Sequence, residues 1–138
     1  MPSVIFLAIA IAAVGVLVLV AIALGGKRRY SFDTEEYQTK WLRIENSLIK
    51  NDPRTYSLAV IEGDKLLDKA LNEMGTPGKT MGERMKKVND RFEKPNAVWS
   101  AHKLRNQIAH EHGFEIEYGQ ASRALTAFRQ ALKDLGAI

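Results

Sequence analysis

Residues 4–24 form an unbroken run of 21 apolar residues, and this run constrains the chain more than any other part of the sequence. It consists of Val, Ile, Phe, Leu, Ala and a single Gly, and residues 1–26 carry no charged side chain. At a rise of about 1.5 Å per residue, a helix of this length spans the hydrocarbon core of a bilayer, which is about 30 Å thick. The run therefore predicts one transmembrane helix, with the lipid bilayer as its partner.

The basic residues Lys27, Arg28 and Arg29 follow the apolar run almost directly. By the positive-inside rule, such a cluster stops translocation and holds the following residues in the cytoplasm. We therefore expect residues 1–29 to anchor a single-pass protein of the cell membrane, with its N-terminus outside and residues 30–138 forming a cytoplasmic domain. A cleaved signal peptide is the alternative, but residues 1–3 lack its basic side chains and its apolar part is only about 7 to 15 residues long.

The domain after the anchor is nearly neutral, although the whole chain has a formal net charge of +4. Three of the 20 basic residues lie in the cluster after the apolar run, so residues 30–138 hold 17 basic and 16 acidic side chains. A domain with this balance has no long-range positive field to attract nucleic acid. The absence of cysteine also excludes a disulfide scaffold, a thiolate zinc site and a cysteine nucleophile.

Capping residues and apolar spacing predict helices along most of residues 30–138. Asp33, Asp52 and Thr80 are the expected N-caps of three helices, and Asn96 is the expected cap of a fourth that runs to Gly113. Residues 114–118 alternate apolar and acidic side chains, but a lone strand would have no partner, so we expect an extended connection before the last helix. The expected fold class is therefore all-α, with a four- to five-helix bundle after the transmembrane helix. The apolar stripes expected in its core are Tyr37, Trp41, Ile44 and Leu48; Tyr56, Val60, Gly63, Leu67, Leu71 and Met74; Met81, Met85, Val88 and Phe92; and Ala121, Leu125, Phe128, Leu132 and Leu135.

The helix expected over residues 97–112 carries an unusual group of polar side chains, including all three histidines of the chain. With residues placed 100° apart, its core face is expected to hold Ala97, Ala101, Leu104 and Ile108. No metal site is expected, because the histidines are too far apart along the helix and no acidic residue completes a set of ligands. The opposite face is expected to combine small and hydrogen-bonding residues: Val98, His102, Arg105, Asn106 and Ala109, with Trp99 and His110 at its margin.

Three of these residues have the chemistry that metal-free cleavage of RNA requires. Histidine exchanges a proton near neutral pH, and arginine binds phosphate through paired N–H groups. Asn106 and His110 are four residues apart, so we expect the amide to orient the imidazole, while Arg105 reaches a phosphate on the same surface. Arg105, Asn106 and His110 are therefore the candidate catalytic residues, with no cofactor, and two copies would supply the acid and the base. The alternative is a helix whose polar side faces water, with Arg105 paired to a carboxylate and His110 capping the helix end.

The octet of residues 104–111, Leu-Arg-Asn-Gln-Ile-Ala-His-Glu, resembles the signature of the HEPN superfamily. That signature is an arginine, four to six residues of which the first is polar, and then a histidine; Arg105, Asn106 and His110 match these positions. The resemblance covers about residues 33–136. It implies a helical bundle, a homodimer in which the Arg and His of both protomers line a cleft, and RNA as the substrate of a metal-independent endoribonuclease, in some members controlled by an antitoxin-like protein partner.

A second interpretation belongs to a different functional class. The HEPN superfamily also contains non-catalytic members that act as dimerisation or binding modules, and the near-neutral domain fits such a role. In that case the chain is a membrane-tethered interaction module. The residues expected at its interface are Val98, Trp99, His102 and Ala109.

Overall fold

The computed structural model describes residues 1–24 and 30–138, so the expected stop-transfer cluster at Lys27, Arg28 and Arg29 lies outside the described residues. Within these ranges every regular element is helical, which confirms the expected all-α class. The helices are α1 (Pro2–Leu24), α2 (Thr34–Ser47), α3 (Tyr56–Glu73), α4 (Met81–Lys87), α5 (Pro95–His110) and α6 (Tyr118–Leu135), with 3-10 turns η1 (Pro53–Thr55) and η2 (Asn89–Arg91).

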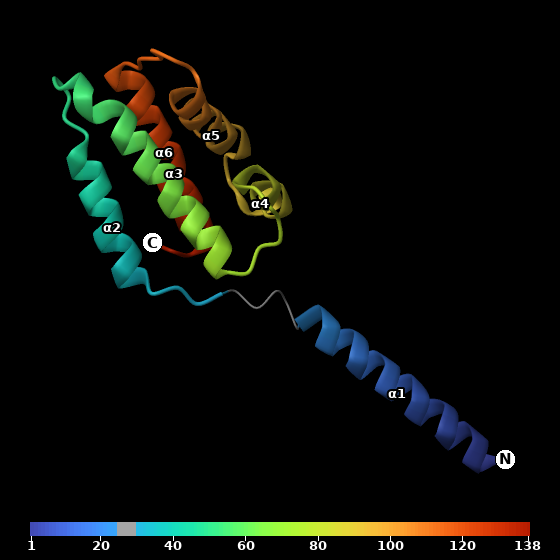
Figure 1. The fold of residues 1–138 in the computed structure, drawn as a ribbon. Helices are drawn as coiled ribbons and strands as arrows, with labels where there is room; N and C mark the ends of the chain where they lie inside the picture. The colour runs from blue at the N-terminus through green and yellow to red at the C-terminus, as the bar shows by residue number, and fades with distance from the viewer. Residues whose placement is uncertain (25–29) are drawn as a thin grey trace.

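Helix α1 is a single apolar rod that stands apart from the other helices (Figure 1). It contains the apolar run predicted to span a bilayer, and none of its residues is buried. The helix is long and apolar enough to cross a membrane. Its apolar side chains therefore find no protein surface to pack against, whereas each of the α-helices α2 to α6 buries side chains.

The other five helices form a bundle in which α3 and α6 lie at the centre. Helix α2 packs on one side of α3, α5 packs against both α6 and α3, and the short α4 contacts α3 (Figure 1). Each apolar stripe expected from the sequence contributes to one continuous core. Its largest fully buried side chains are Tyr37, Phe128, Leu67, Leu71, Met85, Leu132, Leu135, Val60 and Val98.

The expected caps at the starts of the first three bundle helices are all present. The Asp33 side chain accepts a hydrogen bond from the amide of Glu36 at 3.1 Å, and Thr80 accepts one from Glu83 at 3.2 Å. Asp52 caps η1, which leads directly into α3. These side chains satisfy amide groups that have no partner within the helix, and they explain why the helix starts could be placed from sequence.

The close approach of α3 and α6 depends on Gly63. A Cβ atom at this position would lie 2.9 Å from Cδ2 of Phe128 and 3.0 Å from Cδ2 of Leu125, shorter than ordinary van der Waals contact. A larger residue would therefore force the two central helices apart or displace the core side chains between them.

Helix α5 differs from its expected limits and from its expected core face. It begins at Pro95 rather than at an Asn96 cap, and it ends at His110 rather than at Gly113. Proline suits this start because its fixed φ fits the first helical turn and its missing N–H would have no partner there. The expectation that Ala97 is buried and Val98 exposed is wrong, since Ala97 is exposed and Val98 is only 1 % exposed.

The reason for this difference is that α5 lies against two helices at once. Ala101 is buried, and Leu104 and Ile108 pack partly buried against the core, as expected. The neighbouring face that includes Val98 turns toward α3 instead of solvent. A single apolar stripe on a helical projection therefore underestimates the buried surface of this helix.

Candidate functional site

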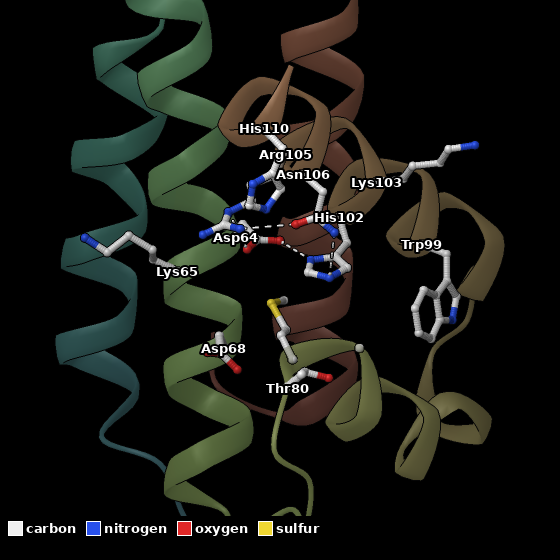
Figure 2. Close-up of a pocket in the computed structure, with 12 residues that line it drawn as sticks. Asp64, Lys65, Asp68, Thr80, Trp99, His102, Lys103, Arg105, Asn106 and His110 are labelled. Atoms are coloured by element: carbon white, nitrogen blue, oxygen red, sulfur yellow. Dashed lines mark hydrogen bonds and ion pairs between the residues drawn. The ribbon is translucent and has the colours of Figure 1, made fainter. Parts of the chain in front are cut away.

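A cleft of about 750 Å³ lies between α3, the start of α4 and the polar face of α5. Helix α3 contributes acidic and basic side chains, α4 contributes its first residues, and α5 contributes most of the polar groups. Figure 2 shows this wall of α5 facing α3. The lining residues are Asp64, Lys65, Asp68, Thr80, Met81, Gly82, Trp99, His102, Lys103, Arg105, Asn106 and His110.

The centre of the cleft is Asp64 of α3, a buried carboxylate that is only 3 % exposed. Its Oδ1 atom lies 2.8 Å from Nδ1 of His102. Its Oδ2 atom lies 3.4 Å from Nε of Arg105, as an ion pair. Because a buried carboxylate is costly unless it is paired, these two contacts explain how the bundle accommodates Asp64.

Asn106 joins the two side chains that contact Asp64. Nη1 of Arg105 donates to its amide oxygen at 3.1 Å, and its amide nitrogen lies 3.4 Å from Nε2 of His102. We call Asp64, His102, Arg105 and Asn106 the cleft cluster. Three of its members come from two adjacent turns of α5, and the fourth comes from α3 (Figure 2).

The guanidinium of Arg105 is oriented within the cluster but keeps hydrogen-bonding capacity. Its Nε atom is buried and has no hydrogen-bond partner among the described residues, since the Asp64 contact is an ion pair without hydrogen-bond geometry. The side chain is 31 % exposed. Arg105 is therefore held at the edge of the cleft, where a planar, permanently charged group can meet an anion.

His110 lies at the last position of α5 and is exposed at the rim of the cleft. The expectation that Asn106 orients it is wrong, because the amide contacts His102 and Arg105 instead. Within residues 1–24 and 30–138, the side chain of His110 makes no hydrogen bond or ion pair. The structure thus brings Arg105, Asn106 and His110 to one cleft, but it gives the orienting contacts to a different histidine.

The residues expected at an interface do not share one surface. Val98 is buried in the core, and Ala109 is exposed. The indole nitrogen of Trp99 donates to Oδ1 of Asn89 at 2.9 Å, and its ring meets that of His102 edge-on, with centroids 6.3 Å apart. His102 belongs to the cleft cluster.

The remaining charged groups near the cleft are turned away or paired. Figure 2 shows Lys65 and Lys103 pointing away from the cleft cluster. Asp68 accepts two hydrogen bonds from Arg84, which is itself buried. In the part of the chain that the structure describes, no group of three or more His, Asp or Glu side chains has a metal-binding arrangement.

Asp64 is the functional candidate that the sequence interpretation missed. Its position was recoverable, because Val60, Asp64, Leu67 and Leu71 have the four-, three- and four-residue spacing of one helix face. An acidic residue in an apolar stripe is buried only when it has a partner, and no local pattern identifies that partner on another helix.

No known protein family, curated protein or solved structure matches the chain. What the domain does must therefore be inferred from its own fold and from the side chains of the cleft.

Proposed function

We propose that the chain is a membrane-anchored, HEPN-like endoribonuclease that cleaves RNA without a metal ion, with Arg105 and His110 in its active site. The observation that carries this proposal is the gathering of Arg105, Asn106 and His110 in one cleft, beside a buried carboxylate that orients the arginine. The bundle is also of the size and helical class that the HEPN resemblance implies.

The reaction is an internal transesterification of RNA. A base removes the proton of a ribose 2′-hydroxyl, the oxygen attacks the adjacent phosphorus, and an acid protonates the departing 5′-oxygen. The products are a 2′,3′-cyclic phosphate and a 5′-hydroxyl. Arg105 contributes by binding the non-bridging phosphate oxygens, whose negative charge increases in the transition state. His110 is one of the two proton-transfer groups that this reaction needs.

The anchor confines this domain to the membrane surface. We propose that α1 spans the bilayer, with residues 1–3 outside the cell and the bundle in the cytoplasm. Support comes from the length and apolar composition of α1 and from the basic residues that follow it in the sequence.

The cleavage assay uses the full chain in detergent micelles with a single-stranded RNA oligonucleotide and a chelator in excess. The wild type is expected to release fragments ending in a 2′,3′-cyclic phosphate, identified by mass spectrometry. Arg105→Ala and His110→Ala are each expected to lower the rate at least about 100-fold, because each removes a transition-state contact or a proton-transfer group.

Matched controls separate this effect from a general loss of charge. His112→Ala removes another exposed histidine just beyond α5, and Arg129→Ala removes an exposed arginine on α6. Both are expected to cleave at the wild-type rate. The proposal is rejected if the wild type leaves the RNA intact, or if Arg105→Ala and His110→Ala cleave as fast as their controls.

The membrane topology is tested with single cysteines, since the chain has none of its own. In intact cells, an impermeant maleimide is expected to label Ser3→Cys and to leave Ser31→Cys unlabelled until the membrane is opened. Labelling of Ser31→Cys in intact cells would reverse the proposed orientation. The proposed anchor would be contradicted if both cysteines were labelled and the chain were absent from the membrane fraction.

A non-catalytic interaction module is the second candidate, and a groove between α5 and α6 favours it. The groove has a volume of about 530 Å³ and is lined partly by small or apolar residues, including Ala97, Leu104 and Ala124. If a second copy binds there, Ala97→Arg is expected to convert dimers into monomers in analytical ultracentrifugation of the micelle-bound chain. A monomeric wild type that cleaves RNA would reject this candidate.

A further inference from the structure

We propose that His102, positioned by Asp64, is the general base of the reaction, so that one chain holds both proton-transfer groups. This inference rests on the proposed ribonuclease function and names a residue outside the Arg105–His110 motif. It starts from the contrast between the two histidines. The side chain of His102 is only 12 % exposed and contacts Asp64, whereas the His110 side chain is exposed and makes no polar contact among the described residues.

The hydrogen bonds of the cleft cluster determine which nitrogen of His102 carries the proton. Arginine has only donors, so the Asn106 atom that contacts Arg105 must be the amide oxygen. The amide nitrogen of Asn106 therefore faces Nε2 of His102 and donates toward it. Nε2 must then be an acceptor, and the proton lies on Nδ1, where it is donated to Asp64 at 2.8 Å.

This arrangement is that of a general base held by a carboxylate. The buried carboxylate of Asp64 fixes the ring orientation and the tautomer, and it stabilises the imidazolium that forms when Nε2 accepts a proton. The contact between Asn106 and Nε2 is long, at 3.4 Å, and the ring borders the cleft. A substrate hydroxyl can therefore replace the weak amide contact at Nε2 without disturbing the bond to Asp64.

The base also lies beside the proposed phosphate-binding group. His102 and Arg105 contact the two oxygen atoms of one carboxylate, which places the imidazole and the guanidinium next to each other. Figure 2 shows His102, Arg105 and His110 on the same wall of the cleft, with the guanidinium at a level between the two imidazoles. A phosphate bound at Arg105 thus has a histidine toward each end of the site.

The proton balance follows from these positions. Nε2 of His102 takes the proton of the 2′-hydroxyl as the oxygen–phosphorus bond forms. Protonated His110, at the exposed rim of the cleft, gives a proton to the 5′-oxygen as its bond to phosphorus breaks. After product release, one proton moves from His102 to solvent and another from solvent to His110. No second copy is required for chemistry.

The kinetic test is the substitution His102→Asn in the full micelle-bound chain. The Asn amide nitrogen can replace Nδ1 as the donor to Asp64, but it offers no base at the position of Nε2. We expect kcat to fall at least about 100-fold with KM changed less than about twofold. Urea unfolding is expected to match that of the wild type. The control His112→Asn makes the same substitution outside the cleft cluster and is expected to leave kcat unchanged.

A mixing experiment tests whether one chain contributes both groups. Equal amounts of His102→Asn and His110→Ala chains are expected to remain as inactive together as apart, because neither chain holds an intact pair. Restored cleavage would show that the two groups come from different chains and would overturn this part of the inference. An active His102→Asn chain, in an enzyme that His110→Ala inactivates, would overturn the role of His102 alone and leave the proposed function standing.

A spectroscopic test does not depend on cleavage. In ¹⁵N-histidine-labelled protein at pH 8, the ring of His102 is expected to show a protonated Nδ1 and an unprotonated Nε2, with assignment by the His102→Asn variant. The opposite tautomer would overturn the inference whatever the cleavage assay shows. A wild-type chain that leaves RNA intact would overturn both the inference and the proposed function.

Discussion

Helix α3 takes part in two clusters of charged and polar side chains that differ mainly in burial. The cleft cluster lies between α3 and α5, around the buried Asp64. The second, which we call the α2–α3 cluster, consists of Glu36 and Tyr37 of α2 with Lys69 and Glu73 of α3. The comparison shows how one helix uses the same chemical groups for different purposes: a half-exposed cluster ties two helices together, and a buried one orients side chains in a cleft.

The α2–α3 cluster pairs each of its four members while leaving its charged side chains in contact with water. Lys69 lies 3.2 Å from Glu36 and also contacts Glu73, and the Tyr37 hydroxyl donates to Glu73 at 2.9 Å. The Lys69 and Glu73 side chains are 36 % and 33 % exposed. Ion pairs with this exposure add little to stability, because solvent screens them. The buried Asp64 has no such alternative partner in water.

The largest expected effect comes from removing the buried carboxylate. Asp64→Ala removes the counterion of Arg105 and the hydrogen-bond acceptor of His102, and we expect a loss of about 3 kcal/mol in the free energy of unfolding. The measurement is urea unfolding of the full micelle-bound chain followed by tryptophan fluorescence, since both tryptophans, Trp41 and Trp99, lie in the bundle. Glu62→Ala, which removes a partly exposed acidic residue of the same helix, is the control. A loss below about 1 kcal/mol would show that Asp64 is not a structural counterion.

A smaller loss is expected when the tyrosine of the α2–α3 cluster is truncated. Tyr37→Phe keeps the buried ring and removes one hydrogen bond to Glu73, so we expect a loss of about 1 kcal/mol at pH 7. Burial, and then the hydrogen bond to Glu73, raise the pKa of Tyr37 above its usual range.

The raised pKa of Tyr37 predicts the direction in which stability changes with pH. With a raised pKa in the folded state, Tyr37 contributes stability below its unfolded pKa of about 10 and loses this contribution as the pH rises above it. The wild type is therefore expected to lose more stability than Tyr37→Phe between pH 9 and pH 11. Parallel curves for the two proteins would exclude this contribution.

Acid should weaken the same cluster by a smaller amount. The hydrogen bond from Lys69 holds the pKa of Glu73 below its usual range, and bonds from Lys40 and Lys69 do the same for Glu36. Lowered pKa values mean that the stabilisation is complete above the unfolded pKa of about 4.3 and is lost as the pH falls through the folded-state value. The difference in urea midpoint between wild type and Glu73→Gln is expected to be largest at pH 6 and to shrink below pH 4. A difference that grows in acid would contradict this assignment.

The smallest expected effect is a difference between the two clusters in how salt changes the stability lost on substitution. Lys69→Met should cost less than about 1 kcal/mol at low ionic strength, and this cost should largely disappear in 1 M NaCl, where the Debye length is about 3 Å. The loss caused by Asp64→Ala should persist in the same salt, because buried pairs are screened much less. Equal salt sensitivity of both variants would remove the distinction between the clusters.

Much of the fold could be predicted from sequence because its signals are local. The N-caps Asp33 and Thr80 lie within one turn of the amides they satisfy, and the apolar stripe of α6 continues to Gly136, whose left-handed φ of 83° ends the helix. The run that forms α1 is similarly local, since length and composition decide it.

The cleft was harder to predict because its contacts join residues distant in sequence. The motif predicted Arg105 and His110 as site residues, but Asp64 lies 38 residues before its partner His102. Asn106 had two histidines within reach along the helix, one turn before it and one turn after it. In the structure Asn106 contacts His102, which shares the carboxylate of Asp64 with Arg105. Helical spacing alone could not show which of the two histidines Asn106 contacts.

The tight packing of Gly63 couples the core of the bundle to the cleft. Gly63 and Asp64 are neighbours on α3, so the seating of the glycine against Phe128 and Leu125 sets the rotation of α3 about its own axis, and with it the direction of the carboxylate. A single methyl group added on the α6 side would therefore turn Asp64 relative to His102. Selection on the cleft would then also act on a residue that does not line it, and a change at Gly63 would have the same effect as a substitution in the cleft although all the cleft residues are intact.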